Sequence, residues 1–180
     1  HLWSQTYNYD PATALSEQRQ LAREVASLIR ARLVPSDRTS APPLQVTNPT
    51  AYEAYLKGRY FLQKPGAAAQ SRARDFFEQS IASDPGFALA HVGLSNYFVT
   101  TDAIAPAEAM GKARASAQRA LALDGALASA HASMAFVHYF GDWDWAGAEH
   151  EFARAIELDP NDAATRRWHA LYLSSMGRHA

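Results

Sequence analysis

Hydrophobic residues recur every three to four positions over most of the chain, which is the spacing of amphipathic helices. From residue 51 onward the pattern is rich in alanine and is broken by turns that contain Asp, Pro or Gly. Residues 35–50 lack the pattern and are rich in Pro, Ser and Thr, which predicts a linker. Residues 1–34 begin with a strand-like alternation and continue as an amphipathic helix. The chain is therefore predicted to start with a strand, a helix and a linker, and to be helical thereafter.

The turns in the helical part repeat. They centre on Asp84, Asp124 and Asp159, which are 40 and 35 residues apart. The segments around them align as FFEQSIASDPGFA, ASAQRALALDGALA and EFARAIELDPNDA. A period in this range is typical of helical repeats, in which each unit is a pair of antiparallel helices, called A and B here. The predicted units are residues 51–86, 87–125 and 126–160, followed by the A helix of a fourth unit at 162–178.

Small residues stand where the two helices of a pair would approach closely, in the middle of the A helices and at two places on the B helices. A large residue, Phe77 or Phe152, is expected to wedge between neighbouring pairs, whereas the middle unit has Ala117 there. The small positions are Gly58, Ser95, Ala135 and Ala170 on the A helices, and Ala73, Ala113, Ala148, Ser80, Ala120 and Ala155 on the B helices.

These positions resemble the tetratricopeptide repeat over residues 51–180. The resemblance implies an all-α fold, built as a right-handed superhelix of antiparallel helix pairs. The sequence LWSQTYNYD, followed by LSEQRQLAREVASLIRARL, is similar to the last strand and helix of TolB-like amino-terminal domains. Residues 1–34 would then be the strand–helix remnant of an upstream α/β domain. Tetratricopeptide repeats follow such domains in bacterial signalling and regulatory proteins.

The resemblance also implies a function for the surface that the A helices line. Stacked helix pairs curve, and their concave surface can hold a protein or peptide partner. Arg59 or Arg167 would pair with an acidic group of that partner. A second interpretation is that the surface is filled from within the same protein, for example by the predicted helix 15–33. The candidate peptide-contacting residues are Tyr52, Tyr55, Arg59, Asn96, Phe136, Tyr139 and Arg167.

Composition removes several other classes of function. The chain has 180 residues, 48% of them hydrophobic, and a formal net charge of -1, so it can build a core and lacks the basic character of a nucleic-acid binder. The absence of cysteine excludes disulfides, iron–sulfur clusters and thiolate chemistry. No apolar run approaches the roughly 18 residues of a membrane helix. Without an initiator Met the chain resembles a piece of a longer protein, which leaves its compartment open, with the cytoplasm favoured.

Histidines and carboxylates give the remaining candidates for chemistry. His131, His138 and His150 could bind a metal only if they converged, yet the first two lie about 10 Å apart along one helix. No HExxH, nucleophile or phosphate-loop motif occurs. We therefore expect no catalytic, cofactor or metal site. Asp144 in GDWDW is expected to cap one helix, and Thr50 another.

The sequence thus favours a non-catalytic scaffold for protein–protein interaction. The alternative is a structural array that oligomerises or acts as a spacer for an upstream domain. An unpaired last helix would expose Leu171, Leu173 and Met176, through which copies of the chain could associate. Trp143 and Trp145 are expected to cover the connection between the two helices of the third unit.

Overall fold

The computed structural model describes residues 48–178, and every regular element in that range is a helix, as predicted for an all-α fold. The chain divides into two units, residues 1–43 and 44–180, and the described residues all belong to the second. The strand and helix predicted for residues 1–34 lie outside the described residues. The helices are α2 (Pro49–Leu62), α3 (Ala67–Ser83), α4 (Ala88–Thr100), α5 (Pro106–Leu123), α6 (Ala128–Phe136), the π-helical segment η1 (Val137–Asp142), α7 (Trp145–Leu158) and α8 (Ala163–Ser175).

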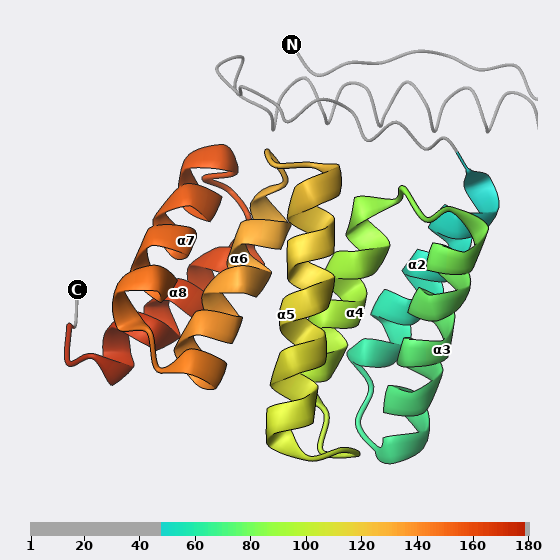
Figure 1. Cartoon of the computed structure of the whole chain (residues 1–180), viewed down its shortest axis with the longest axis horizontal. Coiled ribbons are helices and arrows are strands. Elements are labelled where there is room, and N and C mark those ends of the chain that lie inside the picture. Colours follow the sequence, from blue (N-terminus) through green and yellow to red (C-terminus); the bar gives the residue numbers. More distant parts are fainter. Residues whose placement is uncertain (1–47, 179–180) are drawn as a thin grey trace, which may run out of the picture. The chain divides into compact units, whose positions relative to one another are not determined.

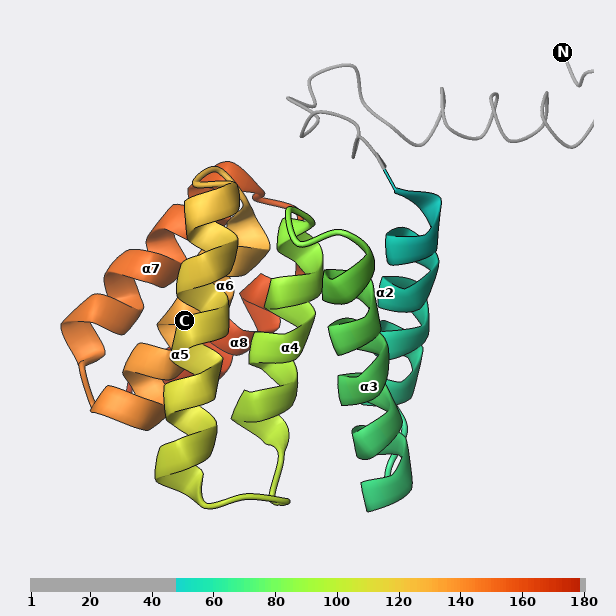
Figure 2. The same cartoon turned by 45° about the vertical axis from the view of Figure 1, so that its right-hand side comes forward.

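The helices pack in consecutive pairs, α2 with α3, α4 with α5 and α6 with α7 (Figure 1). Within each pair the two helices run in opposite directions, and the pairs follow one another in chain order (Figure 2). Neighbouring pairs touch in two ways. The second helix of one pair contacts the first helix of the next, and the first helices also contact each other, α2 with α4 and α4 with α6. The last helix, α8, packs against α7.

The three Asp-centred turns have the same local geometry, which follows from their common sequence pattern. The backbone N–H groups of Asp84, Asp124 and Asp159 each donate to the carbonyl four residues earlier, at 2.9 Å in all three turns. Their Oδ1 atoms accept from the backbone N–H two residues later, at 3.0, 2.9 and 3.0 Å. Each side chain thereby satisfies a backbone N–H group within its own turn, as in an Asx turn. The repetition predicted for these turns is confirmed.

The small positions are buried where two helices cross. All six on α3, α5 and α7 have no exposed surface. On the first helices, Gly58, Ser95 and Ala135 are also buried, and the Ser95 hydroxyl donates to the carbonyl of Ala113 at 2.9 Å. Ala170 departs from the expectation and is exposed. The reason is that no helix among residues 48–178 covers this side of α8, as α5 covers α4 and α7 covers α6.

The start of α2 differs from the prediction. The cap is Asn48, whose side chain accepts from the backbone N–H groups of Thr50 and Ala51 at 3.0 and 3.2 Å. Thr50 is therefore wrong as the cap, and the helix begins at Pro49, where the missing N–H costs nothing. The Asn48 amide also donates to the carbonyl of Ser83 at 2.8 Å, so it joins the start of α2 to the end of α3.

The connection between α6 and α7 is the irregular part of the array. η1 has the wider π-helical turn, which accommodates an additional residue within the helix. Asp144 caps α7 as predicted, because its side chain accepts from the backbone N–H of Gly147 at 2.9 Å. Trp143 has a left-handed backbone (φ 57°) and its side chain is 70% exposed, so it does not cover the connection. Trp145 is half-buried beside Tyr139.

Candidate functional site

Three of the predicted peptide-contacting residues lie together on α2. The Tyr52 and Tyr55 ring centroids are 6.3 Å apart, and the guanidinium of Arg59 lies over the Tyr55 ring at 5.7 Å. Phe87, which precedes α4, meets the Tyr55 ring edge-on at 5.5 Å. Tyr55 is buried, and this burial raises the pKa of its phenol, so the ring is a neutral part of the core. Arg59 is the exposed member of the group.

Asn96 joins the first helices of two pairs. Its side-chain oxygen accepts from the hydroxyl of Ser133 on α6 at 3.0 Å. Ser133 also donates to the carbonyl of Ser129, at 2.9 Å, within its own helix. The side chain of Asn96 is therefore half-buried and already engaged between α4 and α6.

Two further candidates, Phe136 on α6 and Tyr139 on η1, pack against α8. The Phe136 ring meets Trp168 edge-on at 4.4 Å, and the Tyr139 ring meets Tyr172 in the same way at 5.6 Å. Phe136 is buried, whereas Tyr139 is half-buried. Arg167 is exposed and its guanidinium lies over Trp168 at 4.9 Å. Most of the aromatic candidates thus contribute to packing between helices, which sequence alone did not separate from ligand binding.

The seven candidates therefore form two groups with Asn96 between them in the chain. Tyr52, Tyr55 and Arg59 share α2. Phe136 on α6 and Tyr139 on η1 pack against α8, which carries Arg167. Within residues 48–178, no hydrogen bond, ion pair or ring contact connects the two groups directly. Phe87 and Trp168 were missed, although Phe87 directly precedes a predicted A helix and Trp168 lies inside one. The signal that could have identified both residues was the presence of a large aromatic side chain at the start of, or within, a predicted A helix.

The histidines have separate partners. His131 Nδ1 lies 2.7 Å from a carboxylate oxygen of Glu151, and its Nε2 lies 3.1 Å from the carbonyl of Gly125. His91, the equivalent residue one unit earlier, lies 3.2 Å from the carbonyl of Pro85. These contacts join the start of a first helix to the turn that precedes it, and for His131 also to α7.

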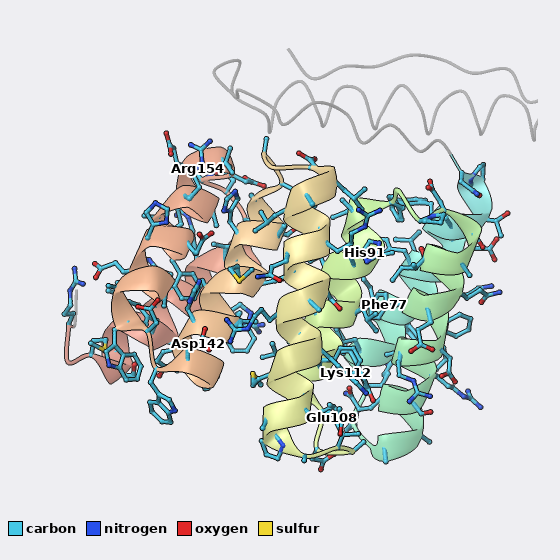
Figure 3. All side chains as sticks on the ribbon, viewed as in Figure 1. Phe77, His91, Glu108, Lys112, Asp142 and Arg154 are labelled. Carbon is cyan, nitrogen blue, oxygen red and sulfur yellow. The ribbon has the colours of Figure 1, made fainter. Side chains whose placement is uncertain are left out.

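His138 belongs to a different cluster, at the end of η1. Its Nδ1 lies 3.4 Å from Asp142 Oδ2 and 3.3 Å from Asp144 Oδ2. The guanidinium of Arg114 on α5 forms a two-pronged ion pair with Asp142 and lowers the pKa of that carboxyl. Figure 3 labels Asp142. Within residues 48–178 no three His, Asp or Glu side chains are arranged to hold a metal ion.

Comparison with known proteins gives a distant relative. No family model matches the chain. A protein of Rhizobium meliloti (strain 1021) with the name "Putative adenylate cyclase 3" is 27% identical over 140 residues, which cover 75% of this chain and 24% of that protein. The chain thus spans about a quarter of this relative's length. Among residues 48–178, no helix is both long and apolar enough to cross a membrane.

Proposed function

We propose that residues 51–180 form a tetratricopeptide-like array, a right-handed superhelix that serves as a non-catalytic scaffold for protein–protein interaction. The identical geometry of the three Asp turns supports a repeat, because equivalent sequences end equivalent helices. Contacts of α2 with α4 and of α4 with α6 also support it, since stacked repeats place their first helices side by side. The partner would lie against these first helices.

We further propose that the array belongs to a larger bacterial regulatory or signalling protein and follows a TolB-like domain. The relative supports the first half of this proposal, because it is a much longer bacterial protein whose name refers to a cyclase, and it matches this chain over about a quarter of its length. A shared segment of this kind is expected when the same array of helices is joined to different domains in different proteins.

The observation that carries the scaffold proposal is the pair of exposed arginines on first helices. Arg59 on α2 and Arg167 on α8 each lie over an aromatic ring and have no acidic partner within residues 48–178. A guanidinium that rests on a ring keeps its N–H edge available for a carboxylate. The two charges would hold an acidic group at either end of a bound segment.

Affinity capture from the source bacterium's lysate, followed by mass spectrometry, tests this proposal. The bait is the full chain, as wild type, as Arg59→Glu/Arg167→Glu and as the matched control Arg119→Glu, which reverses one exposed charge on α5. We expect one set of proteins to be kept by the wild type and the control and lost by the double variant. Equal capture by all three baits would contradict a recognition role for these first helices.

The non-catalytic part of the proposal has its own test, because the relative is named as a cyclase. We expect the purified chain to form no cyclic AMP from ATP, with or without Mg²⁺ or Mn²⁺. A turnover that scales with protein concentration would overturn this expectation and place the catalytic machinery within these 180 residues.

A structural role is the second candidate, and the exposed end of α8 favours it. Leu171 is 49% exposed and Met176 is 40% exposed. Exposed apolar residues on a helix of a repeat stack are a surface for self-association. Sedimentation of the wild type should then show a mass that rises with concentration, and Leu171→Glu should abolish the rise. A constant monomer mass would exclude association through α8.

A further inference from the structure

A strip of cations and aromatic rings follows the junction of α2 and α3. On α2, Lys57 stands three residues before Tyr60 and four before Phe61, so it can reach the neighbourhood of both rings. Lys64 follows in the turn after the helix, four residues beyond Tyr60. The two members on α3 are four residues apart and face them. We call this the cationic–aromatic strip, and its members are Lys57, Tyr60 and Phe61 on α2, Lys64 in the turn that follows, and Arg72 and Phe76 on α3.

The rings of the strip are in contact with one another. Phe61 and Phe76 stack with their centroids 5.5 Å apart and an interplanar angle of 12°. Tyr60 meets Phe61 edge-on at 5.3 Å. The two Phe rings are half-buried, whereas the Tyr60 side chain is 57% exposed. The strip therefore has a base fixed by helix packing and an outer ring that is open to a partner.

Each cation of the strip lies over one of these rings. Lys64 Nζ is 4.8 Å from the Tyr60 centroid, and the Arg72 guanidinium carbon is 5.5 Å from that of Phe61. Lys57 Nζ is 5.8 Å from the Phe76 centroid and also pairs with Glu53 at 2.7 Å. Lys64 and Arg72 differ from Lys57, because neither has an acidic partner within residues 48–178. The strip thus holds two positive charges in place without neutralising them.

Apolar surface adjoins these two charges. Leu56 is 43% exposed and stands four residues before Tyr60, on the same side of α2. Large hydrophobic side chains with this degree of exposure are few among the described residues, and two of them are neighbours here. An exposed apolar area bordered by charges of one sign is the pattern of an interaction surface.

We propose that the cationic–aromatic strip is a docking surface for an acidic protein segment in which Asp or Glu side chains flank an apolar one. The apolar side chain would cover Leu56 and Tyr60. Arg72, which lies over the Phe61 ring, would grip one carboxylate through two N–H groups, and Lys64 would pair with another. The complementary charge of the partner follows from the unpaired cations. This surface excludes Arg59 and Arg167, so it is a second one on the proposed scaffold.

The test measures fluorescence anisotropy of a labelled peptide of mixed Glu and Leu, with blocked ends, titrated with the full chain. A peptide with Gln in place of Glu is the control ligand. We expect Lys64→Glu/Arg72→Glu to weaken binding of the Glu peptide by at least about tenfold, since two charge-assisted contacts are reversed. Arg119→Glu, with one reversed charge elsewhere, should bind as the wild type does. Raised salt should weaken the wild-type complex.

Additional variants and ligands show whether a change in binding arises at the cationic–aromatic strip. Lys64→Glu/Arg72→Glu should weaken binding of the Glu peptide more than Arg59→Glu/Arg167→Glu does, which separates this proposal from the one on the first helices; the reverse order would overturn it. If circular dichroism shows that the charge-reversed variant does not fold, Lys64→Gln/Arg72→Gln takes its place, with the same direction expected. Absence of binding to the Glu peptide, or equal binding of the Gln peptide, overturns the proposal. So does tighter binding to single-stranded DNA or to phosphatidylserine vesicles than to the peptide.

Discussion

The first and third helix pairs place a phenylalanine at the same position and make room for it differently. Phe77 on α3 and Phe152 on α7 are both completely buried. Phe77 lies between two glycines, one on α2 and one on α4 (Figure 3). A Cβ atom at Gly58 would come within 2.6 Å of the Phe77 ring, and one at Gly93 within 2.3 Å. The ring therefore occupies space that exists only because both helices lack a side chain there.

Phe152 has larger neighbours. Its centroid lies 6.0 Å from that of Phe136, 5.7 Å from that of Tyr172 and 5.4 Å from that of His169. Here the ring belongs to a cluster of rings on α6, α7 and α8. Two interfaces with one sequence position in common thus reach close packing by different means, backbone approach in the first case and aromatic packing in the second.

The middle pair shows a third solution. Ala117 stands at this position on α5 and is completely buried. It belongs to the same hydrophobic cluster as Met134 on α6 and Val137 on η1, and its position holds no ring. The position accordingly requires a filled interface and does not require an aromatic residue.

Removal of the Phe77 ring or the Phe152 ring should have the largest effect on stability. Phe77→Ala and Phe152→Ala should each lower the free energy of unfolding by about 3–5 kcal/mol. We expect Phe77→Ala to be the more severe, because glycines offer no side chains that could relax into the cavity, whereas the rings around Phe152 can shift. Chemical denaturation measures both values. Phe140→Ala removes an exposed ring and should cost less than about 1 kcal/mol. A larger loss for Phe152→Ala would reverse the comparison.

A side chain added at Gly93 should have the next largest effect on the free energy of unfolding. Gly93→Ala should destabilise the protein by about 1–3 kcal/mol, because its Cβ collides with a buried ring. The control is Gly111→Ala on α5, where an added Cβ meets nothing within 4 Å. That change should be neutral or stabilising, since alanine is the better helix former. In the double variant Gly93→Ala/Phe77→Leu the cost of Gly93→Ala should shrink, and strict additivity of the two changes would contradict the proposed contact.

The features that could be predicted from the sequence are those that depend on local pattern. Asp84, Asp124 and Asp159 form equivalent turns because each carries its own hydrogen-bonding side chain. The small residues of α3, α5 and α7 are buried because their spacing fixes one helix face. Both kinds of prediction need no knowledge of how helices rotate against each other.

The features that the sequence did not reveal depend on contacts between elements. Tyr55 and Phe136 were candidates for ligand binding, yet both are buried. Tyr55 packs against Phe87 in the turn before α4, and Phe136 packs against Trp168 on α8. Trp143 is exposed because a π-helical segment and a left-handed residue redirect the chain after α6. Neither outcome can be obtained from periodicity, since an aromatic residue fits a core and a binding surface equally well.

The starts of α3 and α7 extend the comparison to the helix ends. α7 begins with the side-chain cap of Asp144, whereas α3 follows Gly66 (φ 99°) and has no side-chain cap. Asp144→Ala should therefore lower the free energy of unfolding by about 1 kcal/mol. Thermal unfolding measures this loss, with Asp102→Ala, in the exposed α4–α5 connection, as the control. Equal melting temperatures for Asp144→Ala and the wild type would show that the cap contributes nothing.

The smallest expected effect is on the pH dependence of stability. It concerns the packing around Phe152, which includes a histidine. His169 packs against Phe152, and burial lowers the pKa of its imidazole; Arg178 lowers it further and Glu149 raises it. A depressed pKa in the folded state means that the unfolded chain binds the proton more readily. Stability is therefore present above the ordinary histidine pKa of about 6.5 and falls as the pH decreases through the lower folded value. His91, whose pKa burial also lowers, acts in the same direction.

Denaturation of the wild type and of His169→Asn at a series of pH values isolates the contribution of the third interface. The wild type should lose more stability than the variant between about pH 7.5 and about pH 5.5. The variant keeps His91 and should retain part of the dependence. His150→Asn, at an exposed site on α7, serves as the matched control for loss of a surface histidine. Parallel curves for the wild type and His169→Asn would mean that the ring next to Phe152 stays as accessible to protons in the folded chain as in the unfolded one.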